Sequence, residues 1–377
     1  VQAGGINNVA IGDHAGTAIT TGDNNVAVGK SAMETNSTAS GNTAVGHLSM
    51  QDNTDGNGNT AVGSCSMEEN TTGSNNTGIG ALALETNTTG AGNTAVGNQS
   101  LEASTTASNN TAVGFCAMHL NETGAANTAI GRNSLLSNTT GADNVGLGNN
   151  AMETNTTGST NVAVGRYALY SNTTANNNTA VGICALYDNT TGTVNTAMGR
   201  QSLQNNTTGD GNTAYGHNSL NTVTTGDCNT AVGGSALFNN TASDNTAVGN
   251  NAMAANTSGA ENVAIGKCAL ATNNTGCRNT AVGFESGKAT TTGVENTFIG
   301  RKAGLVNTEG ENNTVVGSFA FTANTTGSSN TAVGKSALTA NTTGYQNTAV
   351  GQNSLDVNET GLQNTAVGSN SLGANTT

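Results

Sequence analysis

A five-residue motif that recurs through the whole chain most constrains how the chain can fold. The motif is Asn-Thr-Ala-Val-Gly at Asn93–Gly97, and near-copies of it begin at 22 asparagines, from Asn8 to Asn364. Of the 21 intervals between these asparagines, 20 are 17 residues long, and the one from Asn229 to Asn245 is 16. A fixed period predicts one structural unit stacked on itself.

The repeat reads Asn-Thr-Ala-Val-Gly-x-x-Ala-Leu-x-x-Asn-Thr-Thr-Gly-x-x, and its positions are numbered here from the first Asn. Asn at position 1 and Gly at position 5 occur in all 22 copies. Position 3 is Ala in 18 copies, position 4 is Val or Ile in 19, and position 9 is Leu or Met in 18. The short interval lacks one residue, and we predict that this residue is missing between Leu237 and Asn239.

This pattern predicts short β-strands and turns. A 17-residue unit rich in Asn, Thr and Gly is too short for a helical pair and poor in helix formers. Alternation over positions 2 to 4 indicates a strand with positions 2 and 4 inward and Ala outward, ended by a Gly with positive φ. We expect a second strand over positions 7 to 10 with position 9 inward, and a turn at 12 to 15. The prediction is an all-β, parallel β-solenoid of about 22 coils, with residues 1–377 as one continuous array.

Composition excludes several classes of protein. Hydrophobic residues make up only 34% of the chain, which also has 52 glycines, and such a composition is compatible with intrinsic disorder. A disordered chain, however, has no reason to keep the same residue types at the same repeat positions. The net charge of −13 argues against a nucleic-acid partner, and the lack of an 18-residue apolar run argues against membrane insertion. Seven of the ten basic residues share position 6, either as a solvated surface or as a stripe that sets the register between chains.

The small residue at position 3 indicates close packing. An open strand face would accept Lys, Glu or Gln, as position 6 does, so something must cover this one. Either the coil's own second layer or the same face of another chain does so, and we favour the second chain. The residues predicted to mediate self-association are Ala95, Ala112, Ala129, Ala163, Ala180 and Ala197.

Position 12 carries an Asn-x-Thr or Asn-x-Ser glycosylation acceptor in most coils. The asparagine is either a turn residue or a carrier of partial glycosylation, with the adjacent Thr pair open to O-linked sugars. The acceptors singled out are Asn70, Asn87, Asn138, Asn155, Asn172 and Asn189.

Residues that carry chemistry do not converge in the repeat. The four histidines lie in separate coils, and four of the six cysteines share position 7 at least three coils apart, too far for a disulfide. Only Cys268 and Cys277 lie within one coil, and small buried side chains are the simpler interpretation of all six. We therefore predict no catalytic, cofactor-binding or metal-binding residue and no enzyme activity.

One segment breaks the pattern repeatedly. Between Asn279 and Phe321, position 9 becomes Gly287, Gly304 and Phe321, and position 3 becomes Phe298 and Val315. The segment is either a local bulge or contact site or a variant coil type, and we favour the variant coil.

The repeat resembles two families of surface fibres. Asn-Val-Ala-Ile-Gly at Asn8–Gly12 and Asn262–Gly266 resembles the head repeat of trimeric autotransporter adhesins, which implies a left-handed parallel β-roll closed into a homotrimer. The full unit, as in Asn76–Gly92, is similar to repeats of long bacterial and phage tail-fibre proteins. The adhesin coil is shorter, by the Asn-Thr-Thr-Gly corner. Because the array starts and stops within a coil, we expect a slice of a longer protein.

Two functional hypotheses follow. The favoured one is a structural, extracellular fibre or stalk, on a cell surface or virion, that self-associates as a trimer or fibre and presents a binding element. The alternative is an adhesin-type module whose repeated flat face binds a repetitive ligand such as cell-surface polysaccharide or ice, which requires the position 2 threonines to face outward. A depolymerase, which needs clustered carboxylates in a groove, ranks lowest.

Overall fold

The computed structural model describes residues 4–376 and divides the chain into two compact units, Val1–Thr191 and Gly192–Thr377. Each unit is a stack of 17-residue coils, so the predicted parallel β-solenoid is confirmed. No helix among the described residues is long and apolar enough to cross a bilayer. One continuous array across both units stays a prediction.

Each coil contributes one three-residue strand. The strands of the first unit are β1 (Val9–Ile11), β2 (Val26–Val28), β3 (Thr43–Val45), β4 (Thr60–Val62), β5 (Thr77–Ile79), β6 (Thr94–Val96), β7 (Thr111–Val113), β8 (Thr128–Ile130), β9 (Val145–Leu147), β10 (Val162–Val164) and β11 (Thr179–Val181). Those of the second unit are β12 (Thr196–Met198), β13 (Thr213–Tyr215), β14 (Thr230–Val232), β15 (Thr246–Val248), β16 (Val263–Ile265), β17 (Thr280–Val282), β18 (Thr297–Ile299), β19 (Thr314–Val316), β20 (Thr331–Val333), β21 (Thr348–Val350) and β22 (Thr365–Val367).

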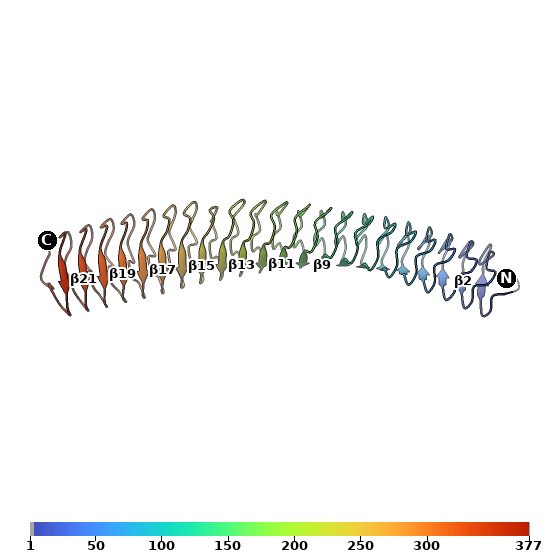
Figure 1. The fold of residues 1–377 in the computed structure, drawn as a ribbon, viewed down its shortest axis with the longest axis horizontal. Coiled ribbons are helices and arrows are strands. Elements are labelled where there is room, and N and C mark those ends of the chain that lie inside the picture. Colours follow the sequence, from blue (N-terminus) through green and yellow to red (C-terminus); the bar gives the residue numbers. More distant parts are fainter. Residues whose placement is uncertain (1–3, 377) are drawn as a thin grey trace. The chain divides into compact units, whose positions relative to one another are not determined.

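Within each unit, consecutive strands pair in parallel and in register, and Figure 1 shows them side by side. Ala95 pairs with Ala112, for example, and Val96 with Val113. Identical repeat positions therefore form columns along the unit, at the spacing of about 4.8 Å usual for parallel strands.

The strands turn their small residue inward. Ala112 is fully buried, whereas Thr111 and Val113 on either side of it are only half-buried. The predicted alternation is correct, but the predicted direction is wrong, because positions 2 and 4 face outward. The interior has little room left at position 3: a methyl group built on Gly146 would lie 3.4 Å from Cγ of Leu135 and 2.6 Å from Oγ of Ser134.

The segment over positions 6 to 11 is a turn and not the predicted second strand. Gln99 and Leu101, at positions 7 and 9, have left-handed backbones with φ of 58° and 51°. This alternation lets the neighbouring Ser100 and Leu101 both point into the core, which two successive residues of a strand cannot do. Hydrogen bonds to adjacent coils offset the cost of the left-handed backbone, such as Leu101 N–H to Ala117 O at 3.0 Å.

The Gly at position 5 forms the predicted corner. Its φ lies between 126° and 154° in every described coil, a conformation that side chains disfavour. The stacking adds a second restriction, since a Cβ on Gly97 would lie 2.4 Å from the carbonyl oxygen of Gly114 in the next coil.

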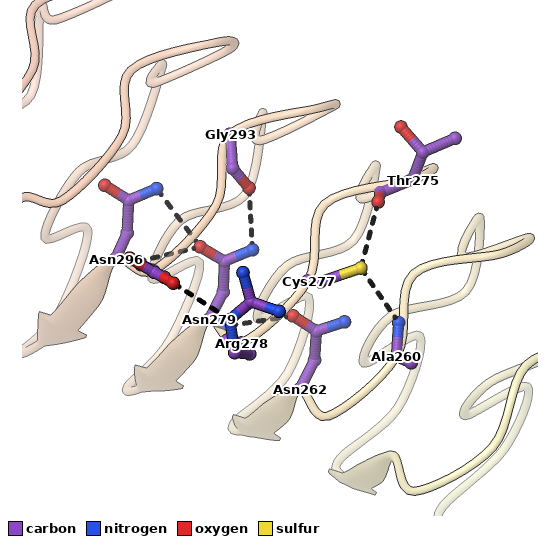
Figure 2. A network of polar contacts seen from close by, with 9 residues as sticks. Ala260, Asn262, Thr275, Cys277, Arg278, Asn279, Gly293 and Asn296 are labelled. Atoms are coloured by element: carbon purple, nitrogen blue, oxygen red, sulfur yellow. Dashed lines mark hydrogen bonds and ion pairs between the residues drawn. The ribbon is translucent and has the colours of Figure 1, made fainter.

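The position 1 asparagines form a buried ladder (Figure 2). The backbone N–H of Asn279 donates to Oδ1 of Asn262 at 2.9 Å, and Asn296 repeats this bond to Asn279 at 3.0 Å. Nδ2 of Asn279 donates to the carbonyl of Gly293 at 2.8 Å. The side chain thus ties one coil to the next and closes its own coil, and these bonds satisfy a polar group that burial would otherwise penalise.

Position 12 supplies a second buried ladder. Nδ2 of Asn155 donates to Oδ1 of Asn138 at 2.8 Å and to the carbonyl of Gly158 at 2.9 Å. The same carbonyl also accepts Nδ2 of Asn144 at 2.8 Å. Each position 15 carbonyl of this kind therefore joins the two ladders across the interior.

The short coil, which begins at Asn229, lacks one residue of the turn that follows Asn240. The predicted place of the missing residue, between Leu237 and Asn239, is wrong. Leu237 and Asn240 keep the buried places of positions 9 and 12. Asn240 Nδ2 then bonds to Ala242 O, two residues on, whereas the regular coil bonds three residues on. The Thr pair has lost one member, and Ala242 replaces the position 15 glycine.

The segment from Asn279 to Phe321 keeps the regular coil. Strands β17, β18 and β19 pair in the usual register, and Phe298, Val315 and Phe321 are fully buried. The segment is a variant coil, as favoured, whose difference lies in the size of its core side chains.

Candidate functional site

Within each unit, the outward side chains of the strands form one surface, called here the sheet face: positions 2 and 4 of every described coil. Position 2 is Thr in 17 of the 22 copies and Val in the other five, and no copy has a charge at either position. Apolar side chains, half-buried or exposed, form the position 4 column; Ile79 is 41% and Ile130 44% exposed in the first unit, and Ile265 41% in the second. Apolar columns of this regularity are typical of surfaces that are covered by something else.

The alanines predicted to mediate self-association do not belong to this surface. Ala95, Ala112, Ala129, Ala163, Ala180 and Ala197 are all fully buried inside their own coils. The prediction is wrong because position 3 packs against the position 8 and 9 side chains of the same chain. Of the two alternatives for this position, the coil's own interior is correct.

The predicted glycosylation acceptors are also inside the coil. Asn70, Asn87, Asn138, Asn155, Asn172 and Asn189 are fully buried, and each donates its amide to the preceding position 12 side chain. A sugar on Nδ2 would break these bonds, so the glycosylation alternative does not fit the folded coil. The turn-residue alternative is the correct one.

Positions 6, 7, 10 and 11 vary from coil to coil and are called here the variable face. Nine of the ten basic residues lie on it, the exception being Arg278 at position 17. Positions 7 and 10 of one coil are neighbours, as the ion pair of Glu285 Oε1 with Lys288 Nζ at 2.8 Å shows. Position 10 side chains of adjacent coils also meet, with His119 Nδ1 lying 3.4 Å from Glu102 Oε2.

One group on the variable face could hold a metal ion, and sequence reasoning missed it. Ligand atoms of Cys65, Glu68 and Glu85 all lie within 4.8 Å of one another. Zinc accepts thiolate and carboxylate ligands. Burial and a hydrogen bond with Glu68 raise the pKa of the Cys65 thiol, and burial and the charges of Glu102 and Glu68 raise that of Glu85. The available signal was Cys at position 7 beside Glu at position 10.

An aromatic cluster occupies the same face in the first unit. It gathers three of the five tyrosines of the chain. The rings of Tyr170 and Tyr187 stack at 5.1 Å, and Tyr167 meets Tyr170 edge-on at 5.4 Å. The Arg166 guanidinium lies 4.7 Å from the centre of the Tyr167 ring, a cation–π contact.

Cysteines and histidines form no larger assembly in the described part of the chain. All six cysteines are free thiols, including the Cys268 and Cys277 pair. Cys277 accepts the N–H of Ala260 at 3.4 Å, a contact within one stack (Figure 2).

Comparison with known proteins gives no family for this chain. Its sequence matches no protein-family model, and no curated protein sequence matches it.

Proposed function

We propose that the chain is a structural module of an extracellular fibre or stalk that associates with further copies of itself through the sheet face. The observation that supports this most directly is the column of exposed Val and Ile side chains at position 4, next to the threonine column of position 2. The residues proposed to make the contact are therefore the outward side chains at positions 2 and 4, and not the buried alanines at position 3 of the same strands.

Burying this surface against a copy of itself costs little. No charged residue lies at positions 2 or 4, so no ion loses its water. Apolar area gains about 25 cal/mol per Å² removed from water, and the gain repeats with every coil. The same columns on each partner offer the same spacing, so the two surfaces match along their length.

The proposed role is mechanical and not catalytic. Within each unit, backbone hydrogen bonds and the position 1 asparagine ladder join successive coils, and the position 12 ladder adds to them in most coils. Thr94 N–H, for example, donates to Asn110 O at 2.8 Å. Such a stack resists bending and local opening because each coil is held on both sides. A stiff module of this kind suits a cell-surface or virion-associated fibre that holds a binding element at a distance.

The test compares the mass of the 377-residue chain with that of two lysine variants. Val62→Lys/Val96→Lys/Val113→Lys places charges on the sheet face, and Ser64→Lys/Asn98→Lys/Asn149→Lys places them at position 6, where other coils carry Lys or Arg. Sedimentation equilibrium should show an oligomer for the wild type and for the position 6 variant and a monomer for the sheet-face variant. A monomeric wild type, or a sheet-face variant that still assembles, contradicts the proposal.

A second function uses the same surface. The position 2 threonines face outward, the condition that a repetitive ligand such as polysaccharide or ice requires, and they form a column at the coil spacing of about 4.8 Å. Under this alternative the chain stays monomeric. It would then slow ice recrystallisation or bind a polysaccharide, and the sheet-face lysines would abolish that activity.

A further inference from the structure

Two shallow hollows lie end to end on the variable face of the second unit. The first, of about 370 Å³, has Phe238, Asn239 and Asn251 among its lining residues and ends at Ala271. The second, of about 510 Å³, begins at Thr272. Alanines at positions 10 and 11 line the first hollow at Ala254, Ala255 and Ala271 and the second at Ala289, where many other coils have larger side chains. Their lining residues span six coils, roughly 24 Å at the usual strand spacing, and the two hollows together are called here the groove.

The far end of this groove is basic. Lys288 Nζ lies 2.8 Å and Lys302 Nζ 3.6 Å from the carboxylate of Glu285, and all three side chains line the second hollow. Glu285 is the one acid on the variable face from Asn262 to Ala323, so the pair keeps a net positive charge. Each ammonium has three N–H donors, and Glu285 holds both in place without using all of them.

Arg301, next to Lys302 in the same coil, adds a further cation to the basic end. The Arg301 guanidinium lies 5.0 Å from the centre of the Phe319 ring. In a chain with a net charge of −13, this concentration of cations favours an anionic partner.

The near end of the groove combines an aromatic ring with amides. Phe238 is half-buried beside small alanines, so part of its ring borders the hollow. The negative face of such a ring attracts the weakly positive C–H groups of a sugar ring. Asn239 and Asn251 place amide groups on the rim, where they can bond to hydroxyl groups.

We propose that this groove binds a short acidic oligosaccharide, with a sugar ring on Phe238 and a carboxylate between Lys288 and Lys302. The groove is open and shallow, which suits a hydrated sugar and leaves a lipid chain exposed to water. Its cations gather at one end, whereas a nucleic acid presents a phosphate at every step. The site does not depend on self-association through the sheet face.

The test measures binding of the full chain to an array of short oligosaccharides containing galacturonate, glucuronate or sialic acid, each beside its neutral counterpart. Acidic sugars should bind more tightly than neutral ones. Lys288→Gln/Lys302→Gln should weaken acid binding at least tenfold, whereas Lys30→Gln/Lys335→Gln, the same change elsewhere on the variable face, should have no effect. Phe238→Ala should weaken the binding of acidic and of neutral sugars to the same extent.

Glu285→Gln separates ligand binding from a structural role. It removes the internal competitor for both lysines and should tighten acid binding severalfold, whereas the loss of a merely structural ion pair would not. Three results overturn the proposal: no acidic sugar binds better than its neutral counterpart, the lysine pair has no effect, or a single-stranded oligonucleotide binds more tightly and with the same lysine dependence.

Discussion

A methyl group on Gly304 would lie 2.3 Å from Cδ1 of Phe298. On the other side of the ring, a methyl on Gly287 would lie 2.7 Å from Cδ2. Phe298 is fully buried at position 3, which is Ala in 18 of the 22 coils, and the two glycines occupy position 9, which is Leu or Met in 18 coils. The Phe298 ring therefore fills the space that Leu or Met side chains at positions 287 and 304 would occupy. A larger residue at position 3 is compensated by smaller residues at position 9, so the packed volume of the core is kept.

Gly304→Leu should destabilise this segment by about 3 kcal/mol or more, because the leucine and the Phe298 ring need the same space. Phe298→Ala alone should cost about 3–5 kcal/mol through the cavity that it opens. Hydrogen exchange of the amides of β17, β18 and β19 measures the loss locally, which suits a stack whose coils open separately.

The matched control restores the common coil. Phe298→Ala/Gly287→Leu/Gly304→Leu should return near to wild-type protection, because leucine tolerates φ near 50° at position 9 elsewhere, as at Leu338. Additive losses in the triple variant would show that the three residues do not share one space.

Interruptions of the position 12 ladder mark weak points. Oδ1 of Asn87 is buried without a hydrogen-bond donor among the described residues, and the next coil has Ser104 in place of Asn. Asn273 stands in the same relation to Thr290. The ladder runs one way, with each amide donating to the coil before it, so a non-Asn residue leaves the preceding oxygen unsatisfied.

Ser104→Asn should therefore stabilise the neighbouring coils by about 1–2 kcal/mol, the usual cost of an unsatisfied buried polar group. Its amide would donate to Asn87, and its oxygen would accept from Asn121. Hydrogen exchange of residues 87–121 measures the gain. Thr106→Asn, on the exposed side of the same turn, is the control and should change nothing. Equal effects of the two changes would contradict this account of the ladder.

Neighbouring residues of one strand should respond in opposite ways to the same substitution. Ala163 is fully buried and Val164 half-buried on the sheet face. Ala163→Lys forces a charge into the interior and should unfold its coils, with a loss of several kcal/mol. Val164→Lys should keep the circular dichroism spectrum and the melting temperature close to wild type. A folded Ala163→Lys chain would mean that position 3 faces outward after all.

The period alone was enough to predict stacked parallel coils, the glycine corner and the buried Leu or Met at position 9, as Gly97 and Leu101 show. It was not enough to predict which strand face points inward. Alternation is the same for both directions, and apolar Val113 looks more like a core residue than Ala112 does. The interior proved too narrow for both Leu and Val in the common coil, because two asparagines also occupy it in most coils.

The candidate sites were harder to predict because they depend on contacts between coils. The 17-residue spacing places Glu68, Glu85 and Glu102 in one column, but the left-handed backbone at position 7 brings Cys65 beside Glu68 and Glu85. Sequence patterns for a strand do not contain that backbone. The part of the groove near Phe238 is lined by small side chains at positions 10 and 11, and no sequence motif marks such a run of alanines.

Glu85 should make stability depend on pH. Burial and the charges of Glu102 and Glu68 raise its pKa above the ordinary 4.5, so the folded chain holds this proton to higher pH than the unfolded chain does. The stabilisation is complete below the ordinary pKa and is lost as pH rises through the raised one. Glu85→Gln should therefore raise stability at pH 7, by about 0.5 kcal/mol for a partly exposed group, and change it little at low pH.

Thermal unfolding at both pH values measures this, with Glu359→Gln, a carboxylate outside the Glu68–Glu102 column, as the control. A gain that is the same at both pH values would show that charge repulsion in the column is not its cause.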